Sequence, residues 1–206
     1  EDMPRLDYSG GASCPALLLE PQRTNLITNS EYLLSGSGWN TNYMNREANS
    51  VVSPDGSQNA TKITPTTDNQ IHSFFKTSEA ISGHIYTAFV KANGYDWVLL
   101  SSHATSAPAA RGCFFYIADD GTPLVNRIGT HTSGNPSIED YGNGWFRISI
   151  DEGNSPSSIY TIIPTPADET IAYAGDGTSG VYVYGFQREA GSYPTSYIPT
   201  YGSSVT

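Results

Sequence analysis

The chain has 206 residues, of which only 15% are charged and 12% are aromatic, and its formal net charge is −10. Such a length suits one large domain with a core of its own, and the aromatic content argues against a disordered chain. The excess of acidic over basic residues, 20 against 10, argues against nucleic acid or anionic lipid as partners, because both attract clustered positive charge.

No stretch is apolar over the roughly 20 residues that a membrane helix needs, and no signal peptide opens the sequence. We therefore expect no membrane insertion. The sequence begins at Glu1 and stops at Thr206 without a natural boundary at either end. This predicts a domain excised from a longer protein.

In chain order, residues 1–24 predict an arm outside the core, and the rest predicts short strands separated by turns. The turns are clearest at Pro54-Asp55-Gly56 and Asn93-Gly94. We predict strands at residues 25–28, 39–44, 60–64, 70–77, 84–92, 96–103, 112–118, 122–128, 145–151, 158–163 and 180–187. Because no helical period is convincing, this arrangement predicts an all-β sandwich or jelly roll.

The last predicted strand and the segment after it organise the chain. Strict alternation over residues 180–187 places Val181, Val183 and Gly185 on one face and Tyr182, Tyr184 and Phe186 on the other. Two prolines in residues 192–199 argue against a central strand or a helix there. We predict an extended strap whose apolar side chains cover the sandwich, namely Tyr193, Tyr197 and Ile198.

Both ends of the sequence resemble one family. Residues 180–200, GVYVYGFQREAGSYPTSYIPT, are similar to the closing strand of carbohydrate-binding-module-like domains in bacteriophage tail proteins, with their Gly-x-Gln-x-Glu-x-Gly turn. Residues 17–27, LLLEPQRTNLI, are similar to the lead-in of the same proteins, and residues 86–92 and 144–149 to their middle strands. The resemblance extends from about residue 4 to residue 206.

The resemblance implies a jelly-roll β-sandwich of two antiparallel sheets with an extended arm and strap. We divide the chain accordingly into an arm (1–24), a carbohydrate-binding-like sandwich (25–191) and a C-terminal strap (192–206). The implied partner is a polysaccharide or cell-surface glycan, and the implied location is the virion tail or the extracellular space.

Catalytic machinery is hard to find in the sequence. The histidines, His72, His84, His103 and His131, show no metal-binding spacing, and there is no Gly-x-Ser-x-Gly elbow for a serine nucleophile. Neighbouring acidic residues such as Asp119 and Asp120 point to opposite faces of an extended chain. We therefore expect a protein that is not an enzyme and requires no cofactor.

The aromatic residues are more informative. Phe146, Ile148 and Ile150 predict the core face of one strand, so that Trp145 and Arg147 share its outer face. An exposed Trp beside an Arg suits sugar binding, because the indole stacks on a pyranose while the guanidinium donates to hydroxyls or a carboxylate. The full predicted carbohydrate-binding set is Trp145, Arg147, Trp97, Tyr95, Tyr116 and His103. The alternative is ordinary packing, with Trp145 covered by the arm or the strap.

Two further expectations concern the chain ends. The resemblance implies one structural calcium held by carboxylates and main-chain carbonyls, with Glu31, Glu189 and Asp176 as its side-chain ligands. Cys14 and Cys113 leave two alternatives open, a disulfide that ties the arm to the sandwich or two unpaired thiols.

Three functions remain open at this point. The first is a non-catalytic carbohydrate-binding module of a phage tail or fibre protein. The second is a spacer of the fibre that binds nothing and forms a homotrimer with its aromatics buried between subunits. The third is an accessory module of a secreted polysaccharide-degrading enzyme.

Overall fold

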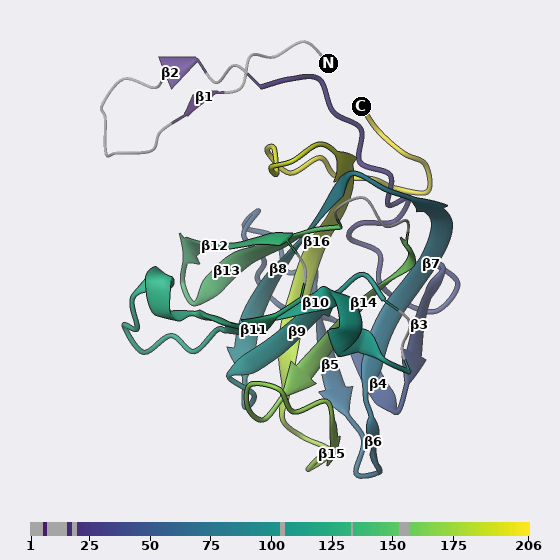
Figure 1. The fold of residues 1–206 in the computed structure, drawn as a ribbon, viewed down its shortest axis with the longest axis vertical. Helices are drawn as coiled ribbons and strands as arrows, with labels where there is room; N and C mark the ends of the chain where they lie inside the picture. The colour runs from purple at the N-terminus through teal and green to yellow at the C-terminus, as the bar shows by residue number, and fades with distance from the viewer. Residues whose placement is uncertain (1–5, 8–15, 18–19, 104–105, 133, 153–156) are drawn as a thin grey trace.

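The computed structural model describes residues 6–7, 16–17, 20–103, 106–132, 134–152 and 157–206, which form two six-stranded antiparallel sheets (Figure 1). The β9 sheet has the order β11 (Ile128–His131), β10 (Gly112–Tyr116), β9 (Trp97–Ser101), β14 (Ser157–Thr165), β7 (Ser73–Ile81) and β3 (Trp39–Asn42). The β8 sheet has the order β12 (Gly134–Gly142), β13 (Trp145–Asp151), β8 (His84–Asn93), β16 (Gly180–Ala190), β5 (Ala60–Pro65) and β4 (Met44–Val51). The predicted all-β fold of two antiparallel sheets is thereby confirmed.

Short elements complete the fold. Two small pairs join β1 (Leu6–Asp7) to β2 (Ala16–Leu17) and β15 (Ala172–Ala174) to β6 (Asn69–Ile71). Two 3₁₀ turns, η2 (Pro108–Arg111) and η3 (Leu124–Asn126), lie before β10 and before β11. No helix in the described ranges is long and apolar enough to cross a membrane.

The main core lies between the two sheets and is rich in aromatic rings. Trp39 stacks on Phe74 with ring centroids 4.8 Å apart, and Phe186 lies 4.4 Å from the same indole. Two smaller apolar clusters lie on the outer faces. One covers the β8 sheet around Phe89 and Trp145, and the other covers the β9 sheet around Leu99, Phe114 and Ile163. Both sheets are therefore partly buried on both faces.

Most strands lie where the sequence places them, and two predicted strands are wrong. Within residues 25–28, Asn25 forms an isolated bridge with Val205 and no strand follows. Directly after this range, Asn29 forms a second isolated bridge with Tyr201. Residues 122–127 form a loop with the 3₁₀ turn η3 instead of a strand, because the guanidinium of Arg127 donates to the carbonyls of Tyr116, Ala118 and Thr122, and only Ile128 of the predicted range lies in a strand. The strand follows later, as β11.

A bulge in β16 corrects the predicted alternation. Val181 and Val183 face the core as expected, but Gly185 adopts a φ of +59° and the pairing with β8 shifts register there. Such a bulge turns the following residues over. Phe186 consequently joins the core, whereas Gln187 and Glu189 point outward beneath the strap.

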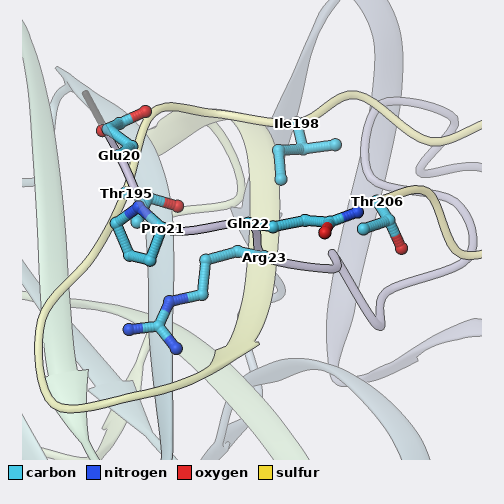
Figure 2. A pocket seen from close by; sticks show the side chains of 7 residues that line it. All are labelled: Glu20, Pro21, Gln22, Arg23, Thr195, Ile198 and Thr206. Carbon is cyan, nitrogen blue, oxygen red and sulfur yellow. The ribbon is translucent and has the colours of Figure 1, made fainter. Parts of the chain in front are cut away.

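Residues 20–25 and 195–206 lie side by side at one end of the sandwich (Figure 1). A hollow of about 240 Å³ separates them and is lined by Glu20, Pro21, Gln22, Arg23, Thr195, Ile198 and Thr206. Figure 2 shows Gln22 reaching toward Thr206, while the guanidinium of Arg23 points the other way. The hydroxyls of Thr24 and Thr206 lie 2.6 Å apart, and we call this contact between the two segments the seam.

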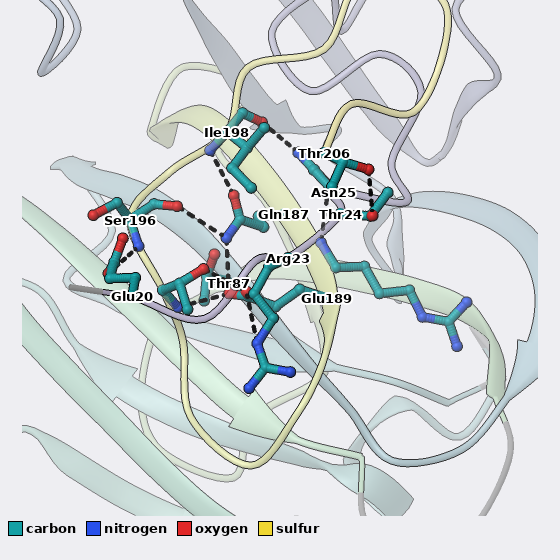
Figure 3. A network of polar contacts seen from close by, with 12 residues as sticks. Glu20, Arg23, Thr24, Asn25, Thr87, Gln187, Glu189, Ser196, Ile198 and Thr206 are labelled. Carbon is teal, nitrogen blue, oxygen red and sulfur yellow. Dashed lines mark hydrogen bonds and ion pairs between the residues drawn. The ribbon is translucent and has the colours of Figure 1, made fainter. Parts of the chain in front are cut away.

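The strap is fixed by polar side chains of β16 (Figure 3). The buried Glu189 carboxylate accepts hydrogen bonds from the amide and hydroxyl of Thr195 at 2.8 and 2.5 Å, and the side-chain oxygen Oε1 of Gln187 accepts one from the amide of Ile198 at 2.7 Å. The fully buried Asn25 donates to the carbonyls of Phe186 and Ile198. The side chains of Gln187 and Glu189 therefore hold the strap on β16, and that of Asn25 links the segment before β3 to both.

The apolar residues of the strap follow the prediction in two of three cases. Ile198 is buried, and Tyr197 lies edge-on to Phe89 with centroids 5.7 Å apart. Tyr193, by contrast, is exposed and lies beneath the guanidinium of Arg23. Of the two cysteines, Cys113 is buried in the core, while Cys14 and the proposed disulfide lie outside the described residues.

Candidate functional site

The predicted platform of Trp145 and Arg147 is not exposed. Both side chains lie on the outer face of β13, as expected, but they retain only 3% and 5% exposure. The strap is the reason. The Arg147 guanidinium donates to the Thr195 carbonyl at 2.6 Å and lies over the Phe89 ring, and Trp145 belongs to the cluster that Tyr197 covers. The prediction of an exposed Trp–Arg pair is therefore wrong, and the packing alternative describes this pair.

The other predicted sugar-binding residues do not join them. Tyr95 is buried against Tyr173 in the main core. Trp97 and Tyr116 do meet, with ring centroids 5.3 Å apart, but on the outer face of the opposite, β9 sheet. His103 is partly buried just after β9. The six residues are therefore distributed over at least two sides of the sandwich instead of forming one site.

The predicted calcium ligands are also separate. Glu189 holds the strap, Asp176 caps its own loop through the amides of Thr178 and Ser179, and Glu31 accepts hydrogen bonds from three tyrosine hydroxyls. Among the described residues, no group of three or more His, Cys, Asp or Glu side chains is placed to hold a metal ion. The expected trio of Glu31, Glu189 and Asp176 is therefore not assembled.

A surface hollow with an exposed aromatic ring lies beside the buried Trp145. We call it the Tyr141 hollow. It has a volume of about 290 Å³ and is lined by Val51, Val52, Ser53, Pro54, Gly56, Lys91, Tyr141, Gly142, Asn143 and Trp145. This volume is at the lower end of the range for small-molecule sites, about 300–1,000 Å³, so the hollow suits a small group such as one sugar ring.

Tyr141 is the prominent residue of this hollow. It is 45% exposed, and its ring lies edge-on to Phe89 with centroids 4.8 Å apart and planes at 83°. This contact braces one edge of the ring, while the exposed part remains open to solvent. An aromatic ring held in this way offers a flat apolar surface to the C–H face of a sugar.

The β-hairpin between β12 and β13 positions Tyr141. Asn143 and Gly144 both adopt positive φ angles, +53° and +75°, which is the conformation that an Asn-Gly hairpin turn requires. The ammonium of Lys91 donates to the Asn143 carbonyl at 2.6 Å and ties the turn to β8. Lys91 from β8 and Asn143 from the turn thus place a charged donor and an amide side chain at the rim of the hollow.

The opposite wall is the loop between β4 and β5. It is closed by hydrogen bonds from the Ser53 hydroxyl and the Ser57 amide to Asp55, at 2.7 and 2.6 Å. The indole of Trp145 donates to the Val52 carbonyl at 3.1 Å and anchors the loop to β13. Trp145 therefore contributes to this site as a wall that fixes the loop.

The carboxyl groups with clear pKa shifts do not suit acid catalysis. Burial raises the pKa of Asp55, but hydrogen bonds from Ser57, Ser53, Asn59 and Tyr184 outweigh this effect and lower it. Hydrogen bonds from Thr122 and Tyr116 lower the pKa of Asp120 to about 2, and those from Ser179 and Thr178 lower that of Asp176. A general acid needs a raised pKa. These three carboxyl groups serve as caps and acceptors of loops.

Comparison with known proteins gives distant structural likenesses. No family model matches the chain, and no curated protein matches it. A single-residue variant of the family 29 carbohydrate-binding module CBM29-2 has a TM-score of 0.47 at 9% identity, over 85% of this chain and 99% of that one. Another variant, complexed with cellulohexaose, has a TM-score of 0.44 at 10% identity, over 82% and 91%.

A third similar structure is part of an enzyme. The CBM22-1–GH10 modules of Clostridium thermocellum endo-1,4-beta-D-xylanase 10B, complexed with xylohexaose, have a TM-score of 0.41 at 11% identity, over 82% of this chain and 29% of that one. At this level of similarity, the function has to be argued from this chain's own residues.

Tyr141 is the residue that sequence reasoning missed. The predicted strands leave residues 137–141 out, and the predicted aromatic set lies elsewhere, around the Asn93-Gly94 turn and on the strands at 112–118 and 145–151. A signal was present in the sequence, because a Tyr directly before Gly-Asn-Gly lies at a hairpin turn, where a ring is seldom covered on both sides.

Proposed function

We propose that this protein is a non-catalytic glycan-binding module that holds a sugar in the Tyr141 hollow. The observation that carries the proposal is the exposed Tyr141 ring, braced by Phe89 beside a hollow with polar donors at its rim. The ring supplies stacking, and Lys91 together with the Asn143 side chain supplies hydrogen bonds to hydroxyl groups. Because the walls are fixed by hydrogen bonds, little ordering is required on binding.

The likeness of the chain ends to phage tail domains favours a glycan on a host surface as the target, with the module placed in a tail or fibre. We include this setting in the proposal. An accessory module of a polysaccharide-degrading enzyme would use the same site, and it differs only in the other domains of the longer protein.

The proposal is tested by glycan-array and affinity-electrophoresis screening of the wild-type domain and Tyr141→Ala. We expect the wild type to bind at least one polysaccharide and Tyr141→Ala to lose most of that binding. Tyr141→Phe should retain it, because the stacking surface stays. The ring is 45% exposed, and its one aromatic contact adds only ~0.5–1.5 kcal/mol to the area that it buries, so Tyr141→Ala should remain folded.

Tyr43→Ala is a matched control. Tyr43 is similarly exposed, at 49%, but it precedes β4 and so lies at the other end of that strand from the hollow. The proposal fails if the wild type binds no glycan, or if Tyr141→Ala binds as well as Tyr43→Ala. Light scattering on the same samples tests the rival spacer function, which requires a stable trimer without glycan binding.

A further inference from the structure

The Tyr141 hollow continues across the outer face of the β8 sheet along one row of cross-strand neighbours. Trp145 pairs with Lys91, Lys91 with Tyr182, and Tyr182 with Lys62. Directly paired residues point to the same side of a sheet. Tyr182 is half-buried in the outer cluster and stands between Lys62 and Lys91 in this row.

A second hollow lies at the far end of this row. It has a volume of about 440 Å³ and is lined by Asn45, Arg46, Glu47, Lys62, Thr64, Gly177 and Thr178. Lys62 thus borders this second hollow, Lys91 borders the Tyr141 hollow, and Tyr182 separates the two. Because neighbouring strands are about 4.8 Å apart, the backbones of the two lysines are separated by roughly 10 Å.

The charges of this row are unusual for the chain. Its net charge is −10, and Lys62, Lys76 and Lys91 are its only lysines. Lys76 is buried and donates to the Ser37 carbonyl, so both partly exposed lysines flank Tyr182. Of the three lysines, the two that are partly exposed therefore both lie on this row of an otherwise acidic protein.

The two ammonium groups are available for a ligand. Within the described ranges no ion pair involves either lysine, although Glu47 is the other cross-strand neighbour of Lys62. Lys91 makes one hydrogen bond, to the Asn143 carbonyl. An ammonium has three donor hydrogens, so Lys91 retains two for a further acceptor. Asp119 lies near the same turn, beside Gly144.

We propose that the glycan is anionic, with carboxylate or sulfate groups that bind Lys62 and Lys91 on either side of the Tyr182 ring. This inference rests on the proposed function, because it names the class of sugar that the Tyr141 hollow and its neighbouring row bind. The ring stacks on one sugar unit, and the two ammonium groups pair with the acidic groups of that unit or of its neighbours.

The test uses two matched pairs of polymers and the intact domain in affinity electrophoresis. Polygalacturonate is compared with its fully methyl-esterified form, and dextran sulfate with dextran. We expect one charged member to bind about ten-fold more tightly than its neutral partner, and the charged pair that binds identifies carboxylate or sulfate. Added salt should weaken the interaction, because it screens exposed charges.

Lys62→Gln and Lys91→Gln should each weaken binding about two- to five-fold, as expected for one exposed ion pair, and Lys62→Arg should restore it. Arg111→Gln is the control, since it removes the same charge from η2 beside the β9 sheet. An equal loss with Arg111→Gln would indicate unspecific attraction of polyanions and overturn the inference. Tight binding of neutral glycans alone overturns the charge assignment but not the proposed function, whereas no glycan binding at all overturns both.

Discussion

The indole nitrogen of Trp145 donates a hydrogen bond to the main-chain carbonyl of Val52, 93 positions away in the sequence, at 3.1 Å. This bond connects β13 to the loop between β4 and β5 and so joins two walls of the Tyr141 hollow. Trp145, which the sequence predicts to be part of an exposed sugar-binding surface, is therefore a buried wall that supports the hollow.

Trp145→Ala should unfold more easily by about 3–5 kcal/mol, because it removes a buried Trp and leaves a cavity. Trp145→Phe keeps most of the packing but loses the hydrogen bond to Val52, so we expect a loss of about 1 kcal/mol. Urea denaturation of the three proteins measures both values. A fully stable Trp145→Ala would show that the outer cluster contributes little.

Glu189→Ala should detach the strap from the sheet. The change leaves the buried amide and hydroxyl of Thr195 without an acceptor, and each buried unsatisfied group costs about 1–3 kcal/mol. Limited chymotrypsin digestion should then cut after Tyr197, which the wild type protects. Glu139→Ala, at an exposed position of β12, should leave the digestion pattern as it is. Equal protection in both variants would contradict the role of Glu189.

The stability of the domain should fall as the pH decreases below about 6.5. Burial lowers the pKa of His84 below its usual value, although its hydrogen bond to the Ser82 carbonyl opposes this, and the positive charge of Arg188 lowers it further. The unfolded state therefore binds the proton more readily, so the contribution of His84 is complete above the unfolded pKa of ~6.5 and is lost as the pH falls toward the folded value.

This pH dependence is measured by urea midpoints between pH 8 and pH 5. His84→Gln should flatten the curve in this interval, whereas His131→Gln, at an exposed position, should not. A curve that keeps its slope in His84→Gln would assign the effect to another group.

The thiol of Cys113 should be unreactive in the folded domain. Burial, together with the negative charge of Asp168, raises its pKa to about 12, so at pH 8 almost no thiolate is present. In a Cys14→Ser variant, Ellman's reagent should label Cys113 only after denaturant is added. Rapid labelling in native buffer would show that the core opens at this point.

The sequence predicts which face each strand turns to the core better than it predicts what covers the opposite face. The alternation around Phe146 correctly places Trp145 and Arg147 on the outer face of β13. Whether that face is open depends on the strap, which is held by single contacts such as the one between Glu189 and Thr195. Contacts between residues far apart in the chain leave no periodic trace along it.

The bulge at Gly185 shows a second limit. A simple period of two predicts that Phe186 shares a face with Tyr184, but one residue in the left-handed region reverses the order for the rest of β16. The Gly itself is visible in the sequence, whereas its φ angle depends on the packing of Phe89 and Tyr197 against it.

The seam between Thr24 and Thr206, 182 positions apart, also has a kinetic consequence. Chains dominated by contacts of such long range have a high contact order and fold slowly. During synthesis, the outer side of the β8 sheet, with Phe89 and Trp145, stays uncovered until the strap has left the ribosome. This interval is the one in which nascent chains of this domain are most exposed to aggregation.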